Sequence, residues 1–147
     1  NPKLWAGIKA EERTDKAVKL EIFGSDNDPR VLGDARRNIA AAGVDRWIKL
    51  EQVDILERAA PAPAGVMVAN PPYGERIGSK EELAEFYPKL GSALKKNYPG
   101  WRCHFFTADM RLPKLVRLQP ARRVPLYNGA LECRLFEIAI VAGSNRR

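Results

Sequence analysis

Apolar residues recur along this chain at two different spacings, and the spacings predict where helices and strands lie. Apolar positions three or four residues apart, with charged positions between them, are typical of amphipathic helices. Alternating or short uniformly apolar runs that end in turn residues are typical of strands. Helices are predicted over residues 2–16, 28–43 and 81–96. Strands are predicted over residues 18–26, 48–53, 66–69, 101–108, 123–127 and 133–141.

The order of these elements predicts an α/β fold. Alternating strands and helices form a mainly parallel sheet covered by helices, and Asn128-Gly129 between the last two runs predicts a closing antiparallel hairpin. The apolar run 66–69 predicts a strand buried on both faces, as in a parallel sheet. Pro88 predicts a kink or a split in its helix, because proline lacks the N–H that a helix requires. The 147 residues are expected to form a single domain over 1–147.

Composition and cysteine usage narrow the class of protein. No apolar run reaches the roughly 20 residues that span a bilayer, and the first residues lack the pattern of a signal peptide. Cys103, Cys133 and the single histidine, His104, form no metal-ligand spacing, so no zinc site is expected. Both cysteines are therefore expected to be buried and reduced, in a cytoplasmic protein that does not associate with membranes.

The net charge of +7 is concentrated near the C-terminus. Residues 1–110 carry 17 Lys and Arg against 16 Asp and Glu, whereas residues 111–147 carry 8 against 2. Such an excess suits a polyanion partner, and a solvated basic surface explains it equally well. On the first interpretation the basic side chains contact nucleic-acid phosphates. These side chains are Arg111, Lys114, Arg117, Arg122 and Arg123.

Acidic residues follow two of the predicted strands, at the edge where open parallel sheets bind their ligands. Asp26 ends the strand over 18–26, and a carboxylate there accepts hydrogen bonds from both hydroxyls of a ribose. Asp54 follows the next strand, where it either accepts from an adenine amino group or stabilises a turn. Asp28 is interpreted as the N-cap of the following helix, because Pro29 suits the first helical turn.

The motif Asn70-Pro71-Pro72-Tyr73 directly after the apolar run 66–69 carries the most specific chemistry. An aromatic amine donates its lone pair to a methyl group only when its two N–H groups are held so that the nitrogen becomes pyramidal. The Asn70 side-chain oxygen and the Pro71 carbonyl are two such acceptors, and the prolines fix their positions in advance. Tyr73 offers a ring on which a flipped or single-stranded base stacks. The alternative is a plain proline turn after a strand.

Three segments resemble one bacterial family. The extended motif Asn70-Pro71-Pro72-Tyr73-Gly74-Glu75-Arg76-Ile77-Gly78 resembles that of methyltransferases long labelled N6-adenine-specific DNA methylases. In this extended form it is similar to the enzymes that make N2-methylguanosine in large-subunit ribosomal RNA. Residues 24–29 resemble the segment that ends the second strand in that family, and residues 125–135 resemble its closing hairpin. The likeness covers the chain from about residue 4 onward.

The resemblance implies a Rossmann-like class I methyltransferase domain that uses S-adenosyl-L-methionine. The implied substrate is the exocyclic amine of a base in RNA, with guanine N2 of large-subunit rRNA as the leading expectation. By this resemblance the cofactor is bound by Asp26, Asn27, Asp54, Ile55 and Asn70. By the same resemblance the target amine is bound by Asn70, Pro71, Pro72 and Tyr73.

Two parts of that family have no counterpart here. Its members carry a glycine-rich loop after a first strand, and they usually carry an N-terminal RNA-binding module. None of the eleven glycines forms a Gly-x-Gly pair, and no strand is predicted before residue 18. The chain is therefore expected to be an N-terminally truncated part of the domain, without the first strand and the glycine loop.

Three alternatives to guanine methylation remain. An adenine-N6 methyltransferase acting on DNA or RNA needs the same acceptors for its amine. A non-catalytic nucleic-acid-binding or scaffold domain explains the basic C-terminal segment without chemistry. A nicotinamide-dependent dehydrogenase is disfavoured, because no glycine fingerprint precedes Asp26.

Overall fold

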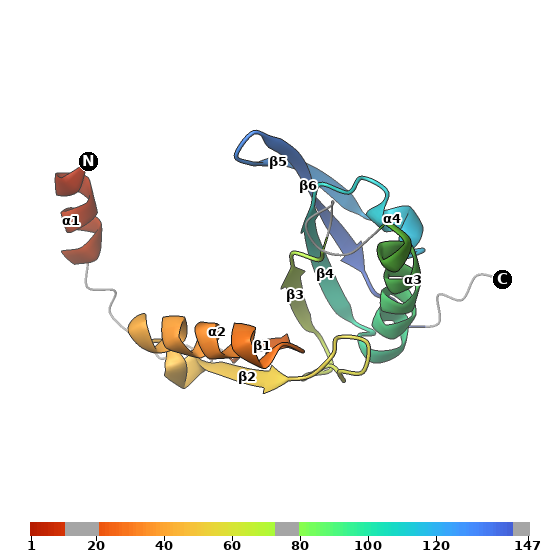
Figure 1. Ribbon diagram of the computed structural model, residues 1–147, viewed down its shortest axis with the longest axis horizontal. Helices are drawn as coiled ribbons and strands as arrows, with labels where there is room; N and C mark the ends of the chain where they lie inside the picture. The colour runs from red at the N-terminus through yellow and green to blue at the C-terminus, as the bar shows by residue number, and fades with distance from the viewer. Residues whose placement is uncertain (11–20, 73–79, 143–147) are drawn as a thin grey trace.

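The chain forms two β-sheets with helices packed against them, and the computed structural model describes residues 1–10, 21–72 and 80–142 (Figure 1). The elements follow one another in the order α1, β1, α2, η1, β2, β3, α3, β4, α4, β5 and β6. This order confirms the alternation expected from the sequence. Only the short helices η1 (Asp45–Trp47) and α4 (Leu112–Leu115) have no counterpart in that expectation. Helix α1 spans Pro2–Ala10, and residues 11–16 of the predicted helix lie outside the described part.

The first sheet contains two parallel strands. β1 (Ile22–Asp26) pairs with β2 (Ile48–Gln52) along its whole length, so that Asp26 lies opposite Gln52 at the carboxyl end. Helix α2 (Pro29–Ala41) connects the two strands and packs on them. The carboxyl ends of β1 and β2 therefore lie side by side, as predicted.

Helix α2 begins and ends where the sequence predicts. The Asp28 carboxylate accepts a hydrogen bond from the backbone N–H of Arg30 at 2.8 Å, which caps the first turn. The helix ends before Gly43, whose φ of +65° lies in the left-handed region that glycine adopts without strain.

The second sheet contains four strands in the spatial order β3-β4-β6-β5. β3 and β4 are parallel, whereas β6 is antiparallel to both β4 and β5. The strands are β3 (Gly65–Ala69), β4 (Trp101–Thr107), β5 (Arg122–Asn128) and β6 (Leu131–Ala139). A parallel pair followed by an antiparallel hairpin is the architecture predicted for this half of the chain.

Most of the hydrophobic core lies between α3 (Lys80–Asn97) and one face of the second sheet (Figure 1). The helix contributes a buried stripe at the spacing of one helical face, formed by Leu83, Tyr87, Leu90 and Leu94. The sheet contributes alternate residues of its two central strands, Cys103, Phe105, Phe136 and Ile138. Gly91 lets α4 approach closely, because a Cβ at this position would collide with the carbonyl oxygen of Val116.

The prediction that β3 is buried on both faces is wrong. Met67 and Ala69 pack against the core, but Val66 and Val68 are 63% and 73% exposed. Successive side chains of a strand point to opposite faces, and α3 covers only one face of this sheet. A uniformly apolar run therefore does not establish that both faces are covered within the same chain.

Two local details also differ from the expectation. Pro88 does not split α3, which is continuous over Lys80–Asn97, and the Pro88 carbonyl accepts a hydrogen bond from the Ser92 hydroxyl at 3.0 Å. In the hairpin the two turn residues are Gly129 and Ala130, one position later than the expected Asn-Gly pair. Gly129 has a φ of +62°, as the first central residue of a type II′ turn requires.

Candidate active site

Residues 70–72, called the Asn70 loop below, lie at the carboxyl end of β3. Ala69 is the last residue of β3 and lies opposite Phe105 of β4, so Asn70 emerges beside the end of the core strand. The Asn70 side chain is exposed, Pro71 is buried and Pro72 is half-buried. The loop therefore presents an amide to solvent from a backbone packed on the protein. Tyr73, the fourth residue of the predicted motif, lies outside the described residues.

Among the described residues, a hydrogen bond from α3 attaches this loop to the core. The Tyr87 hydroxyl donates to the carbonyl oxygen of Pro72 at 2.5 Å. Tyr87 is 0% exposed, and burial together with the nearby Asp109 carboxylate raises the pKa of its hydroxyl to about 12. The hydroxyl therefore keeps its proton and acts as a donor at any pH near neutrality.

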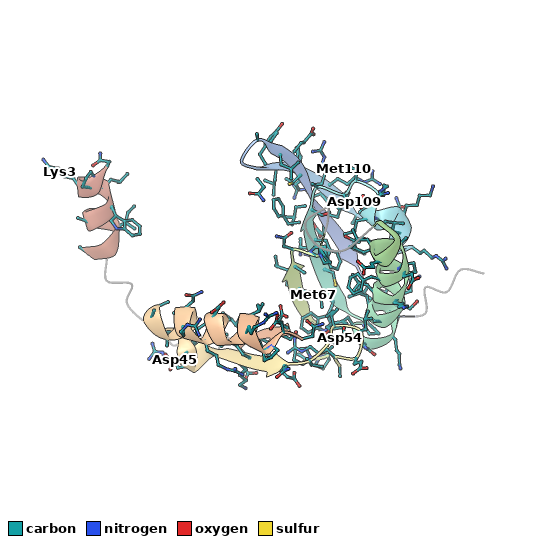
Figure 2. All side chains as sticks on the ribbon, in the orientation of Figure 1. Lys3, Asp45, Asp54, Met67, Asp109 and Met110 are labelled. Carbon is teal, nitrogen blue, oxygen red and sulfur yellow. The ribbon has the colours of Figure 1, made fainter. Side chains whose placement is uncertain are left out.

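A second polar group lies beyond the end of β4 (Figure 2). The backbone N–H of Asp109 donates to the buried Thr107 hydroxyl at 3.0 Å. The Arg111 side chain donates two hydrogen bonds of 2.9 Å to the Asp109 carboxylate, and they hold the pKa of Asp109 below its usual value. Arg111, predicted to contact phosphate, is thus also half of an ion pair with a largely buried carboxylate.

The predicted cofactor residues form a group of their own at the ends of β1 and β2. The Asp26 backbone carbonyl accepts from the Val53 N–H at 3.1 Å, and the Asn27 carbonyl accepts from the Gln52 amide at 3.3 Å. These bonds bring Asp26 and Asn27 beside the segment that contains Asp54. Ile55 is partly buried against the core.

Both aspartates of this group also stabilise turns. The Asp26 carboxylate accepts from the Asp28 N–H at 2.8 Å, and the Asp54 carboxylate accepts from the Leu56 N–H at 2.8 Å. In each case the bond uses Oδ1, and within the described residues no hydrogen bond occupies Oδ2. The turn role and the ligand role expected from the sequence are therefore compatible.

The structure brings the predicted residues together in two clusters, not one. Asn70, Pro71 and Pro72 lie at the end of β3, whereas Asp26 and Asp54 lie at the ends of the first sheet. In the described part of the chain, no hydrogen bond or ion pair connects the two clusters. Among the described strands each sheet has two unpaired edges, at β1 and β2 in the first sheet and at β3 and β5 in the second.

The five predicted phosphate contacts are all exposed. Arg111, Lys114 and Arg117 lie on and around α4, and Arg122 and Arg123 lie at the start of β5. Arg117 has a φ of +55°, a left-handed conformation that is uncommon for a residue with a side chain.

The β5–β6 hairpin extends beyond the carboxyl end of β4. The last residue of β4, Thr107, lies opposite Arg134, so residues 126–133 project beyond the carboxyl end of β4 (Figure 1). Tyr127 and Leu131 near the tip are 70% and 48% exposed. The projecting hairpin rises from the same end of the sheet as the Asn70 loop.

The remaining candidates are inert in this structure. Cys103 and Cys133 are free and fully buried, and burial raises the pKa of the Cys103 thiol to about 11. Over residues 1–10, 21–72 and 80–142, no three His, Cys, Asp or Glu side chains gather as a metal site would require. Among the helices in those ranges, none is both long and apolar enough to cross a membrane.

Comparison with known proteins defines the class. The parallel strands, the polar loops at their carboxyl ends and the closing hairpin are those of a class I methyltransferase domain. The chain belongs to the RMKL-like methyltransferase domain family (UPF0020), whose profile matches residues 2–137. The fold and the family expected from the sequence are thereby confirmed.

Two curated relatives are ribosomal RNA large subunit methyltransferases K/L. The protein from Shewanella baltica (strain OS195) is 37% identical over 149 residues, which covers 98% of this chain and 21% of the relative. The protein from Hahella chejuensis is 38% identical over 146 residues, covering 92% and 20%. The chain thus spans about a fifth of the length of these relatives.

Solved structures share the fold. SMU.472, a protein assigned as a methyltransferase and complexed with SAH, is 26% identical with a TM-score of 0.80, over 98% of this chain and 37% of that chain. A protein of Clostridium difficile 630 assigned as a methylase is 28% identical with a TM-score of 0.81, over 100% and 39%. One from Listeria monocytogenes str. 4b F2365, assigned as an N6-adenine-specific DNA methylase, is 27% identical with a TM-score of 0.74, over 93% and 35%.

Proposed function

We propose that this chain is the part of an S-adenosyl-L-methionine-dependent methyltransferase that binds the target amine, and that it methylates guanine N2 in large-subunit rRNA. The observation that carries the proposal is the placement of Asn70, Pro71 and Pro72 at the carboxyl end of β3, with the Pro72 carbonyl held by the core. The proposal is also supported by the similarity of this chain to rRNA large subunit methyltransferases K/L, together with its membership of the RMKL-like family.

The Asn70 loop provides the geometry that an aromatic amine needs. The Asn70 side-chain oxygen and the Pro71 carbonyl accept one hydrogen bond each from the two N–H groups, which directs the nitrogen lone pair toward the methyl donor. S-adenosyl-L-methionine supplies a methyl group on a sulfonium sulfur. The nitrogen gains the methyl carbon as the carbon–sulfur bond breaks, and it then releases one proton to water. No strong base is required, because the methylated nitrogen is acidic.

The residues at the ends of β1 and β2 fit the cofactor. The hydrogen bonds on Oδ1 fix the orientation of the Asp26 and Asp54 carboxylates, and no described residue donates to Oδ2 of either, which can therefore accept from the cofactor. Asp26, with Asn27 beside it, suits the ribose hydroxyls, and Asp54 suits the adenine amino group. Partly buried Ile55 offers an apolar contact for the adenine ring.

The site proposed here is completed by a further strand. A strand that pairs with the open edges of β1 and β3 joins the two sheets into one, and its carboxyl end then lies between the two clusters. A loop at that position contacts the methionine part of the cofactor. We therefore expect the whole protein, not this chain alone, to bind the cofactor tightly.

RNA is proposed to lie along the basic residues and the projecting hairpin. Arg122 and Arg123 stand at the base of that hairpin, and Tyr127 offers an exposed ring near its tip. Because phosphate contacts release counterions, RNA binding should weaken steeply as the salt concentration rises. An N-terminal RNA-binding module in the full-length protein and a cytoplasmic location belong to the same proposal.

The test is Asn70→Ala in the full-length protein, with Asn38→Ala on the exposed surface of α2 as the matched control. Transfer of a labelled methyl group to unmodified large-subunit rRNA is measured, and the product nucleoside is identified by mass spectrometry. We expect Asn70→Ala to lower kcat by about 100-fold, since one orienting acceptor is lost, while circular dichroism stays unchanged. Undiminished transfer by Asn70→Ala would falsify the catalytic role and favour a scaffold domain.

A second candidate is methylation of adenine N6, which is supported by the likeness to the Listeria protein assigned as an N6-adenine-specific DNA methylase. The same acceptors hold either amine, so the loop does not distinguish them. The assay above therefore includes duplex DNA and an RNA without guanine as substrates. N6-methyladenosine as the product replaces the guanine proposal with this one.

A further inference from the structure

We propose that Tyr87 is a positioning residue of the methyl-transfer site, which holds the Asn70 loop at the geometry that the amine requires. This inference rests on the function proposed above. It concerns a residue of α3 that does not belong to the motif and does not touch the substrate. Burial, backbone chemistry, packing and protonation of this residue and the loop support it in turn.

The first step is the burial of the Tyr87 hydroxyl. The neighbours of Tyr87 on the buried face of α3 are Leu83, Leu90 and Leu94, all at most 5% exposed. A phenylalanine would fill such a position without a polar group to satisfy. A buried hydroxyl without a partner is destabilising, and here the partner is the Pro72 carbonyl at 2.5 Å. The polar end of Tyr87 is therefore directed to the Asn70 loop.

The second step is the backbone chemistry of the loop. Pro71 and Pro72 have no N–H, so two consecutive residues have no donor with which to fix the loop to the sheet. The backbone of these two residues can form hydrogen bonds to the rest of the protein only through its carbonyl oxygens. Tyr87 takes the Pro72 carbonyl, and within the described residues no hydrogen bond ends on the Pro71 carbonyl. As far as the described residues are concerned, the Pro71 carbonyl is open to a hydrogen bond from the amine.

The third step is the rigidity of the anchor. Tyr87 is 0% exposed, its ring lies 5.8 Å from that of Phe86, and α3 packs on β4 and β6 through the core. A hydrogen bond from this ring therefore connects the loop to the main hydrophobic core. A displacement of about 1 Å in reacting groups costs on the order of 100-fold in rate, so such an anchor has a measurable effect.

The fourth step is that the donor keeps its proton. Burial and the Asp109 carboxylate raise the pKa of the Tyr87 hydroxyl to about 12. Tyr87 is thus a permanent donor and takes no part in proton transfer. The expected effect of its loss is consequently the same at every pH near neutrality.

The chain offers a matched control. Tyr98 directly follows α3, packs in the same core and is 1% exposed, but its hydroxyl makes no hydrogen bond to residues 70–72. Tyr98→Phe removes a buried hydroxyl far from any bond to the loop, whereas Tyr87→Phe removes the anchor. Both variants keep the ring that fills the core.

The experiment uses the full-length protein and its rRNA substrate. For Tyr87→Phe we expect kcat to fall about 10- to 100-fold at all pH values from 6 to 9, with Kd for S-adenosylhomocysteine within about twofold of wild type. Hydrogen exchange at the backbone amides of Ala69 and Asn70 should be faster than in wild type. Tyr98→Phe should leave kcat and exchange unchanged.

Two outcomes overturn the inference. Wild-type kcat in Tyr87→Phe shows that the hydroxyl does not position the loop. Equal losses of kcat in Tyr87→Phe and Tyr98→Phe, in proportion to a lower Tm, show a purely structural role. The rate of hydrogen exchange at the Asn70 amide tests whether Tyr87 anchors the loop, and this test does not require that the protein methylates rRNA. Methyl transfer by Asn70→Ala tests the proposed function separately. The failure of one proposal is therefore distinguishable from the failure of the other.

Discussion

The two sheets of this domain differ in how much of the molecule supports them. Residues 83–140, which include α3 and most of the four-stranded sheet, contain nearly all of the buried apolar residues, whereas in residues 21–52 only Leu32 is buried. The loop proposed to orient the amine stands on the well-packed sheet and is anchored to its core by Tyr87. The carboxylates proposed to bind the cofactor stand on the thin one and are fixed by turn hydrogen bonds. The residues proposed to orient the amine are thus supported by the main core, whereas those proposed to bind the cofactor are supported mainly by local turns.

The largest effect tests this difference directly, by removing one buried side chain from each region. Phe105→Ala in β4 should lower the free energy of unfolding by about 3–5 kcal/mol, because it leaves a cavity in the main core. Leu32→Ala in α2 should cost less, about 2 kcal/mol, since its sparsely packed surroundings can collapse around the gap. Denaturant unfolding of the full-length variants measures both. Equal losses would mean that the first sheet is packed as tightly as the second.

A smaller effect concerns acid stability at the carboxyl end of β4. The pKa of Asp109 is lowered by Arg111, so the carboxylate stabilises the fold above its unfolded-state value near 3.8, and this contribution is lost as the pH falls through the lower folded-state value. Asp109→Asn should therefore make the free energy of unfolding less dependent on pH below about 4, with little change in that slope at neutral pH. Urea titrations between pH 2.5 and 6 provide the measurement. An unchanged acid slope in Asp109→Asn contradicts the assignment.

The smallest effect on stability is expected for substitution of Arg117. The same substitution should have a larger effect on the binding of rRNA. Glycine adopts the φ of +55° without strain, but it loses more conformational entropy on folding than arginine does. The two effects oppose each other, so the free energy of unfolding of Arg117→Gly should stay within about 1 kcal/mol of wild type. If Arg117 contacts phosphate, the variant should bind rRNA more weakly and show a shallower salt dependence. Filter binding at several salt concentrations tests this, with Arg36→Gln on α2 as a control of equal charge change. A wild-type salt slope removes Arg117 from the RNA contacts.

The elements of the fold were predictable because their signals are local. Asp28 and Gly43 mark the ends of α2, and the Asn128-Gly129 pair marks a hairpin whose turn lies one residue later. The exposure of Val66 and Val68 was not predictable, because it depends on which elements cover a face and not on the strand itself.

Some residues of the candidate site were predictable from the sequence, and others were not. Asn70, Asp26 and Asp54 follow strand ends that the sequence defines, and the structure places all three at carboxyl ends. Tyr87 was not predicted, because the helical pattern alone does not show which residue outside the helix its hydroxyl contacts. Its signal was present as a polar group on a buried face, which requires a partner that only the tertiary structure identifies.

The contact between Tyr87 and Pro72 also has a consequence for folding kinetics. The β5–β6 hairpin closes over two residues, whereas β3 reaches β4 only after a connection that includes all of α3. Closing a long loop costs more conformational entropy than closing a short one, and this cost precedes the stabilising contacts. The hairpin can therefore form early and the β3–β4 pair late. During synthesis Asn70 leaves the ribosome before the tyrosine and the strand that fix its loop. The amine-binding geometry is therefore among the last features of the domain to be assembled.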